Sequence, residues 1–530
     1  MKRGFFSFGV LLVFVPQALG HVGSPNVFFE GRAGAYSVYA VVRPPAALPG
    51  PAQVSVRLQE PDIRSVSLVP VLYQAGPEGS PLPVVAQRVP GEPQLWTAEV
   101  WLLRPGSYTI HLTIDGARGA GESTVPVNAL GMQNQQMTGG LRATLLAAGL
   151  LLILSALLIV GAVAREGGLA WREQPEKRAA LRGLRASGIA AILLAASIAA
   201  VAVRWRNMDL AYRTQGVQKP EPVMAAVRTE GQQVLLELRQ TEQSMSVPSW
   251  DSLVPDHGKL MHLFLMRQPD LNVFAHLHPV RQNGRTFVLE APALPAGGYE
   301  LFGDVTFENG MNQTVIANVT LPEPAGALLA PPPLVTNFPG DVICGFSGGP
   351  AATAGQIARD LDDSWHVGQD EPVRLGNRLP KNYPGGGLIS RLMGGNTLFF
   401  ENAGEVASGL GNSMRFAAFR PDGTEAALQP YMGMLGHAAV RRADGSVFVH
   451  LHPSGSFSMA SQEVFRQREG GARAGAAIAG MNDSTVSISS NRVAFPYEFP
   501  KTGLYRVWVQ VRITGRVLTG VYDLDIKSGT

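Results

Sequence analysis

The sequence predicts an all-β protein of three sandwich domains, joined to a hairpin of two transmembrane helices. Sixty glycines and 39 prolines in 530 residues favour turn-rich β domains over helical ones. Two apolar stretches near the middle of the chain are long enough to cross a bilayer. A histidine-bearing segment occurs twice, which indicates that two of the β domains arose by duplication. A chain of this length is also too long for a single core.

The N-terminus has the layout of a secretory signal. Two basic residues precede an apolar run over residues 5–15. Small residues at Ala18 and Gly20 then fit cleavage directly before His21. We therefore expect residues 1–20 to be a signal peptide, with an uncleaved anchor as the alternative. In either case the domain that follows is exported.

Residues 21–130 are expected to form the first β-sandwich. The runs 35–42 and 54–58 alternate or are β-branched, and the run 108–114 alternates strictly between apolar and polar residues. Proline-rich joints separate these runs. An immunoglobulin-like or cupredoxin-like sandwich fits this spacing.

The two apolar stretches are residues 143–164 and residues 186–203. The first contains no charged residue, and the second is rich in alanine. Residues 165–185 between them carry six basic side chains, so this loop is expected on the cytoplasmic side. The flanking domains would then face the periplasm or the cell exterior. The sequence thus predicts a protein of the cytoplasmic membrane, with the lipid bilayer as a partner.

Two further β units are expected after the helices, over residues 224–322 and 397–528. Proline and glycine are frequent between them, so residues 323–396 are expected to be a linker or an irregular region. Within that region, the polar segment 362–366 is interpreted as a loop. Similar strand-entry segments near the ends of the two units support a duplication.

Each of these two units carries the same histidine pattern, an upstream histidine followed by His-x-His-Pro. Six of the ten histidines of the chain belong to these triplets, which are His262, His276 and His278 in the first copy and His437, His450 and His452 in the second. Residues i and i+2 of a strand point to the same face, and a hairpin can place the upstream histidine opposite the pair. Three converging imidazoles suit Cu(II), Zn(II) or Fe(II), with open positions left on the metal.

Further candidate ligands tilt the choice of metal toward copper. Met432, Met434 and Met459 lie near the second triplet in sequence, and thioethers favour Cu(I), although methionine more often fills a core. His257 lies ahead of the first triplet. If the signal peptide is cleaved, the α-amine and imidazole of His21 can chelate one copper ion, with His111 as a candidate second imidazole. The single cysteine of the chain excludes multi-thiolate sites.

The segment Met261-His262-Leu263-Phe264 through His276-Leu277-His278-Pro279 resembles the YtkA-like family of small exported β-sandwiches. The segment Tyr431-Met432-Gly433-Met434-Leu435-Gly436-His437 through Pro453 resembles the same family. This resemblance implies that the two units handle copper and deliver it to respiratory oxidases.

These observations predict a membrane-anchored exported protein that binds and passes copper, with zinc as the alternative metal. A membrane copper enzyme or transporter is the expected protein partner. Nucleic acid is not an expected partner, because the net charge of +3 is small and much of the basicity lies in one loop. A non-metal envelope scaffold with structural histidines and a metal-dependent oxidase stay open as alternatives. The sequence contains no motif that supports a particular enzymatic activity.

Overall fold

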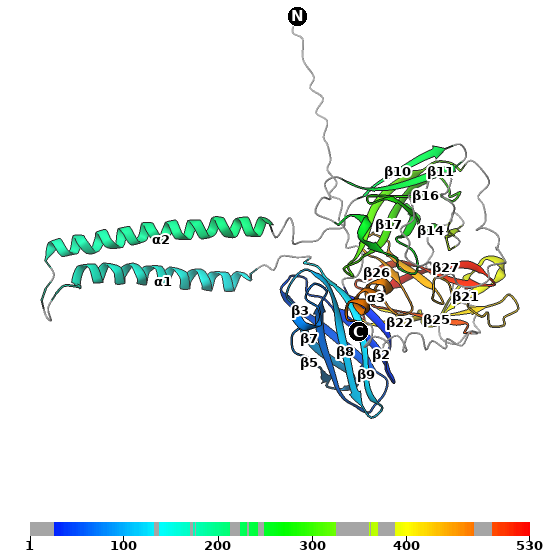
Figure 1. Cartoon of the computed structure of the whole chain (residues 1–530), viewed down its shortest axis with the longest axis horizontal. Coiled ribbons are helices and arrows are strands. Elements are labelled where there is room, and N and C mark those ends of the chain that lie inside the picture. Colours follow the sequence, from blue (N-terminus) through cyan, green and yellow to red (C-terminus); the bar gives the residue numbers. More distant parts are fainter. Residues whose placement is uncertain are drawn as a thin grey trace, which may run out of the picture. The chain divides into compact units, whose positions relative to one another are not determined.

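The computed structural model describes most of the chain outside the N-terminus and the long inter-repeat segment. The described residues are 26–131, 137–169, 173–174, 176–211, 223–230, 233–241, 248–324, 360, 362–368, 387–470 and 490–529. The expected signal peptide, His21 and most of the expected linker lie outside them. The described residues form a mainly β protein with six antiparallel sheets and two long helices, as Figure 1 shows. One compact unit contains the sheets on both sides of the helical hairpin in sequence, and a second unit contains the hairpin.

The first β domain is a sandwich-like pair of sheets, as the alternation of its sequence predicts. Its strands are β1 (Val27–Ala33), β2 (Tyr36–Arg43), β3 (Gly50–Leu58), β4 (Ile63–Leu72), β5 (Val84–Val85), β6 (Gln87–Val89), β7 (Glu92–Leu102), β8 (Gly106–Gly116) and β9 (Gly119–Ala129). They form one sheet of order β1-β2-β3-β7-β6 and a second of order β5-β4-β8-β9. Side chains alternate between buried and outward positions along β3, so one face of its sheet packs into the core.

Two long helices, α1 (Gly139–Glu166) and α2 (Lys177–Ala211), pack against each other as a hairpin. Both are long and apolar enough to cross a membrane, with mean hydropathies of 2.8 and 2.3 over their most apolar windows. Small residues bring the two backbones close together. A Cβ on Gly161 would lie 2.4 Å from the Ser187 hydroxyl, which donates a hydrogen bond to the Leu157 carbonyl at 2.9 Å.

The first histidine repeat is built from two sheets that share a core. Its strands are β10 (Val223–Glu230), β11 (Gln233–Gln240), β12 (Leu253–Val254), β13 (His262–Arg267), β14 (Val273–Leu277), β15 (Val280–Asn283), β16 (Thr286–Glu290), β17 (Gly297–Phe307), β18 (Asn312–Leu321) and β19 (Ser364–Val367). The orders are β10-β11-β16-β15 and β12-β17-β13-β14-β19, with β18 on β17.

The segment 362–366, interpreted from the sequence as a loop, contains most of strand β19. This strand pairs with β14 from Val273 opposite Val367 to His276 opposite Ser364. Trp365 is buried in the core of the repeat, and the added strand covers an edge of β14 that would otherwise be unpaired. The expected irregular region therefore completes the sheet that carries the first His-x-His pair.

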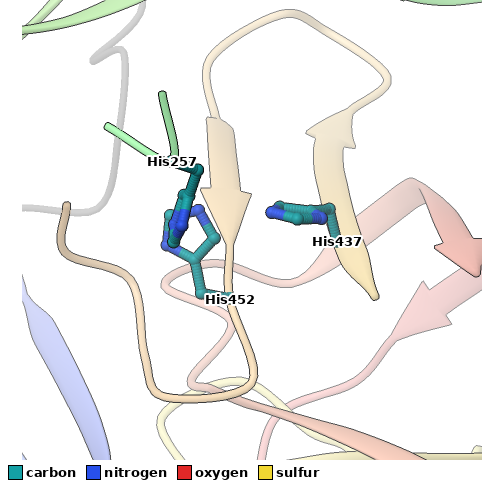
Figure 2. Close-up of side chains that lie close together, drawn as sticks. All are labelled: His257, His437 and His452. Carbon is teal, nitrogen blue, oxygen red and sulfur yellow. The ribbon is translucent and has the colours of Figure 1, made fainter. Parts of the chain in front are cut away.

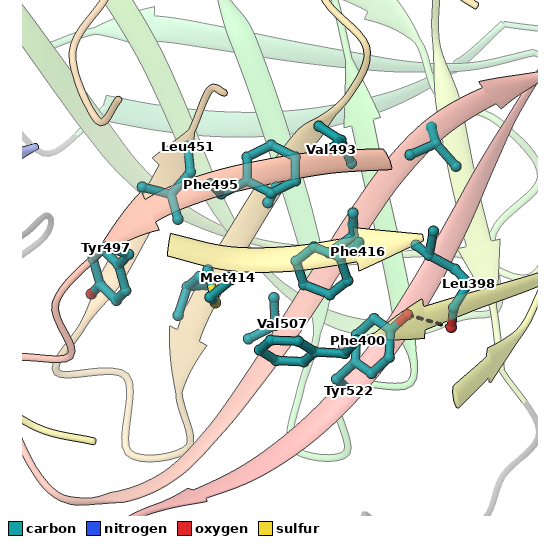
Figure 3. Close-up of a cluster of buried hydrophobic side chains, with 14 of the residues drawn as sticks. Leu398, Phe400, Met414, Phe416, Leu451, Val493, Phe495, Tyr497, Val507 and Tyr522 are labelled. Atoms are coloured by element: carbon teal, nitrogen blue, oxygen red, sulfur yellow. Dashed lines mark hydrogen bonds between the residues drawn. The ribbon is translucent and has the colours of Figure 1, made fainter. Parts of the chain in front are cut away.

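The second repeat also pairs two sheets. Its elements are β20 (Leu388–Arg391), β21 (Thr397–Phe400), β22 (Asn412–Phe419), β23 (His437–Arg442), β24 (Phe448–Leu451), α3 (Met459–Arg468), β25 (Arg492–Tyr497), β26 (Gly503–Ile513) and β27 (Arg516–Ile526). The orders are β20-β21-β22-β25 and β24-β23-β26-β27. Figure 3 shows aromatic rings between the two layers, and the buried Tyr522 hydroxyl donates a hydrogen bond to the Leu398 carbonyl at 2.7 Å.

Two elements of the second repeat differ from the sequence-based expectation. Strand β20 lies within the segment expected to be a linker. Helix α3 lies in a domain expected to be all β, and its apolar periodicity is weak. Its start is nevertheless well defined, because the Ser458 side chain caps it by accepting a hydrogen bond from the Ser461 amide at 3.3 Å.

Strand β1 of the first domain pairs with the chain that follows the second His-x-His pair. The Glu30 amide donates to the Ser454 carbonyl at 2.9 Å, and the Ser456 amide donates to the Phe28 carbonyl at 3.1 Å. Gly455 fits between them because a Cβ there would lie 2.0 Å from the Phe28 carbonyl oxygen. The first domain and the second repeat are thus joined directly next to the histidines.

Candidate metal centre

Two equivalent hairpins present the histidine triplets, as the spacing predicts. In β13–β14 the register pairs Leu263 with Leu277, and in β23–β24 it pairs Ala438 with Leu451. The upstream histidine of each hairpin consequently lies opposite the second histidine of the His-x-His pair. The ring centroids of these two histidines are 5.2 Å apart in both repeats.

The two hairpins face each other through a small aromatic cluster with local two-fold symmetry. Phe274 stacks on Trp508 with ring centroids 4.9 Å apart, and Phe448 stacks on Phe302 with centroids 4.0 Å apart. Phe274 and Phe448 occupy the same position, two residues before the first histidine of the His-x-His pair. Trp508 and Phe302 also occupy equivalent positions on the neighbouring strands. The same contact is therefore made in both directions, as in an isologous interface.

The polar contacts obey the same symmetry. His276 Nδ1 lies 2.9 Å from Oε1 of Gln510 in the second repeat, and His450 Nδ1 lies 3.4 Å from Oδ2 of Asp304 in the first. Gln510 and Asp304 are equivalent residues, because each is the register partner of the upstream histidine in its own repeat. Each repeat thus orients a histidine ring of the other.

The facing hairpins bring both triplets and His257 into one buried cluster. The six triplet histidines are at most 9% exposed. The His450 ring lies 5.4 Å from that of His262 and 4.4 Å from that of His452, so it contacts both repeats. We refer to these seven side chains as the histidine cluster; its members are His257, His262, His276, His278, His437, His450 and His452.

Two groups within the cluster have ligand atoms close enough to share an ion. His262, His276 and His278 form one group, and His257, His437 and His452 form the other, with all ligand atoms of a group within 4.8 Å of one another. Figure 2 shows that His257 reaches His437 and His452 from a separate segment. The second group therefore combines His257 of the first repeat with His437 and His452 of the second, a combination that sequence spacing alone did not indicate.

In the first group, two ring nitrogens are separated by about the distance expected for two ligands of one metal ion. His262 Nε2 donates a hydrogen bond to the Asp256 carbonyl at 3.1 Å, so its Nδ1 carries a lone pair. That lone pair points at His276 Nε2, 3.1 Å away. Two nitrogens bound to one tetrahedral ion are roughly 3.3 Å apart. When His276 Nδ1 donates a hydrogen bond to Gln510, Nε2 of the same ring carries a lone pair that faces the lone pair on His262 Nδ1. A cation bound by both nitrogens would satisfy both lone pairs.

In His278, His450 and His452, one ring nitrogen is held and the other is left without a hydrogen-bond partner, whereas both nitrogens of His437 lack one. His278 Nδ1 lies 3.0 Å from the Asp363 carboxylate, and His452 Nδ1 donates to the Phe457 carbonyl at 3.1 Å. The buried nitrogens without a hydrogen-bond partner include Nε2 of His278, Nε2 of His450, Nε2 of His452 and both nitrogens of His437. A buried polar atom left without a partner costs about 1–3 kcal/mol. Metal-ligating histidines show this same pattern of one anchored and one available nitrogen.

Burial keeps the cluster in the form that binds metal. It lowers the pKa of His262, His276, His437 and His452 well below the ordinary value of 6.5, and neighbouring histidines lower these pKa values further. Burial also lowers the pKa of His257. Neutral imidazole is the ligand form, so at pH 7 these rings need lose no proton to bind an ion.

The remaining residues singled out from the sequence include His111 of the first sandwich and two methionines of the second repeat. Met434 closes a turn by accepting a backbone hydrogen bond from Tyr431 at 2.7 Å, and the Met459 sulfur accepts one from the Ser454 hydroxyl at 3.3 Å. His111 Nε2 lies 2.8 Å from the Glu469 carboxylate rather than in the cluster. His21 lies outside the described residues.

Sequence reasoning missed the residues that orient the rings. Asp363, Asp304 and Gln510 each contact a cluster histidine, and Asp363 is the main omission because its segment was interpreted as a loop. The Asp363 carboxylate accepts from both the backbone amide and the ring of His278, at 2.8 and 3.0 Å. The sequence signal that could have indicated Asp363 is its position directly before a strand that contains a buried tryptophan.

Replacing Asp363 with asparagine should weaken metal binding by about 10- to 100-fold, because the carboxylate fixes the orientation of the His278 ring. Competition with a chelator of known affinity would measure the effect. Asp362→Asn is the matched control, since the Asp362 carboxylate pairs with Lys259 at 3.3 Å. Equal affinities for the two variants would show that Asp363 does not support a ligand.

A comparison with family models finds one match. Residues 223–322 and 394–528 match a model described as "Domain of unknown function (DUF8832)". The matched residues are the two histidine repeats and exclude the first sandwich and the helices. No curated protein matches the chain.

Solved structures match the chain only at low similarity. A tetra-tandem repeat in the extending region of a large adhesion protein is 8% identical, over 91% of this chain and 72% of that one, with a TM-score of 0.15. Dimeric latent PorU from Porphyromonas gingivalis is 6% identical, over 95% and 34%, with a TM-score of 0.14. Salmonella alpha-2-macroglobulin is 10% identical, over 96% and 24%, with a TM-score of 0.19. The chain thus spans about a third of PorU and a quarter of the macroglobulin, and the histidine cluster lies in the part that matches the DUF8832 model.

Proposed function

We propose that this protein is a membrane-anchored, exported metal-binding protein that holds and passes copper. The observation that carries the proposal is the convergence of six histidines, five of them buried, in two groups of three whose ligand atoms lie within 4.8 Å of one another. Burial lowers the pKa of His257, His262, His276, His437 and His452, so these rings are neutral at pH 7. Several cluster rings have one nitrogen anchored and the other available. A purely structural role would leave these buried nitrogens without compensation.

The composition of the cluster supports a transition metal, and copper in particular. Imidazole suits copper and zinc, whereas calcium and magnesium need oxygen-rich sites. Asp360 and Asp363 form a further group with His278 whose ligand atoms lie within 4.8 Å of one another, and Asp363 already contacts the His278 ring. Three-imidazole groups leave positions on the metal open, which suits exchange better than a closed structural site. The YtkA-like resemblance of the two hairpins supports copper over zinc.

The helical hairpin supports a role at the membrane surface. Two helices long and apolar enough to cross a bilayer would tether the cluster near membrane partners. Tethering raises the effective concentration of bound copper for a membrane enzyme or transporter. With the basic loop on the cytoplasmic side, the cluster would face the periplasm or the cell exterior.

The test is metal content of the full chain in detergent after equilibration with Cu(I), Cu(II) or Zn(II) at neutral pH. We expect about two copper ions per chain, one for each histidine group. The double variant His276→Ala/His278→Ala should lose at least one of them, because it removes two of three ligands from one group. The double variant His111→Ala/His366→Ala removes two imidazoles outside the cluster and should retain both ions.

Two results would contradict the proposal in different ways. Tight zinc binding with no preference for copper would redirect the assignment to a zinc site. Failure of all three ions to bind would favour a membrane-tethered scaffold in which the histidines are structural. Circular dichroism of each variant separates loss of ligands from loss of fold.

A further inference from the structure

The two repeats differ at one structurally equivalent position close to the histidine cluster. His257 in the first repeat and Met432 in the second precede the upstream histidine of their hairpin by the same distance. Both adopt the same left-handed conformation, with φ of 51° and 49°. Each is followed by a glycine with positive φ, Gly258 at 81° and Gly433 at 77°. A backbone bridge closes the turn in both repeats, so the two turns share one conformation.

The first-repeat turn contributes its histidine to the second repeat. The His257 ring lies 5.0 Å from that of His452 and 5.7 Å from that of His437. The two turns are also neighbours, because a Cβ on Gly433 would lie 3.8 Å from His257 Nδ1. His257 therefore completes a ligand group across the boundary between the repeats.

The local two-fold symmetry should relate the contact of His257 with the second repeat to an equivalent contact of Met432 with the first repeat. The symmetry is established by the paired aromatic stacks and by the paired polar contacts of His276 with Gln510 and of His450 with Asp304. Applied to His257, it predicts that Met432 lies beside the histidines of the first repeat. Met432 is 9% exposed, so most of its side chain is covered by protein.

We propose that the Met432 thioether is a ligand of the first histidine group, together with His262, His276 and His278. The proposal rests on the metal-binding function inferred above and specifies the two ligand sets. The first position then has three imidazoles and one thioether. The second has imidazoles only, from His257, His437 and His452. The duplicated fold thus holds two chemically different positions.

The difference in ligands gives the two positions different preferences for the oxidation state of copper. A thioether is a soft ligand and stabilises Cu(I), whereas imidazole also suits Cu(II). The first position should therefore favour Cu(I) and the second should accept Cu(II). His450 contacts rings of both repeats and lies between the two positions.

X-ray absorption at the copper edge tests the assignment on the Cu(I)-loaded full chain in detergent. We expect a sulfur scatterer amounting to one sulfur for every two copper ions, and its loss in Met432→Leu. Met434→Leu and Met459→Leu are matched controls that should keep the sulfur signal. Met432→Leu should also weaken binding of Cu(I) at one position by about tenfold, a change of roughly 1.4 kcal/mol. Met432→His should replace the sulfur by nitrogen and retain both ions.

The possible outcomes separate this inference from the function on which it rests. Two bound copper ions with only nitrogen or oxygen scatterers in the wild-type protein would overturn the Met432 assignment and leave metal binding intact. A sulfur signal that survives in Met432→Leu but disappears in a control variant would assign the thioether elsewhere and likewise overturn it. Absence of bound copper in the wild-type protein would overturn the function itself.

Discussion

Removing the bound metal should lower the thermal midpoint of the full-length protein by roughly 10 °C. His257 from the first repeat and His437 and His452 from the second would bind one ion, so the metal ties the repeats together. An ion at a thousand times its dissociation constant stabilises the folded state by about 4 kcal/mol. For a β unit of this size, each kcal/mol shifts the midpoint by about 2–4 °C. Calorimetry with and without a chelator in the same detergent measures the shift.

The His257→Ala variant sharpens this test, because it removes the ligand that crosses between the repeats and leaves the second triplet intact. It should lose a large part of the metal-dependent shift. His111→Ala should keep the full shift, since His111 pairs with Glu469 outside the cluster. Equal midpoints for the metal-loaded and chelated wild-type protein would contradict a metal that joins the two repeats.

Acidification should strongly destabilise the metal-free protein between pH 6.5 and pH 5. Burial lowers the pKa of His262, His276, His437 and His452 well below 6.5 in the folded state. Below pH 6.5 the unfolded chain therefore binds more protons than the folded one, and stability is lost as the pH falls. Each such histidine contributes about 1.4 kcal/mol per pH unit, and four together give a slope of up to about 5 kcal/mol per pH unit.

Urea unfolding in a chelator at pH 7.5, 6.5 and 5.5 would measure this dependence. We expect little change between the two higher values and a steep loss at the lowest. His437→Gln/His452→Gln should flatten the profile, because two of the groups that take up protons on unfolding are gone. His366 contributes the same pH dependence to the wild-type protein and to this variant, since burial lowers its pKa to about 4. A wild-type profile that is flat down to pH 5.5 would mean that the cluster is open to water.

The hairpins could be predicted from the sequence because their signals are local. The alternation of side chains places both members of a His-x-His pair on one face. The Asp-Gly turn that ends in Gly445, with φ of 74°, indicates where the second hairpin reverses. The apolar runs likewise predicted two long helices, although α1 and α2 extend several residues beyond the expected spans at both ends.

The joining of the two triplets could not be predicted, because it depends on packing between distant segments. The alternation of side chains along a strand shows which face of the sheet a histidine occupies, but it does not show which segment packs against that face. The stacks of Phe274 on Trp508 and of Phe448 on Phe302 bring the two faces together. Neither pair has a sequence signature. For the same reason, His257 was expected near its own triplet and is instead grouped with the other.

The pairing of strand β1 with the chain beyond the second His-x-His pair constrains how the protein is made. The Phe28 amide bonds to the Ser456 hydroxyl at 3.1 Å, yet the two residues are 428 positions apart and the membrane hairpin lies between them. β1 is an edge strand of its sheet, and its partner is translated only after the hairpin. The first sandwich must therefore persist with an uncovered edge until the second repeat has been synthesised. The covering of that edge and the completion of the cluster both depend on the second repeat.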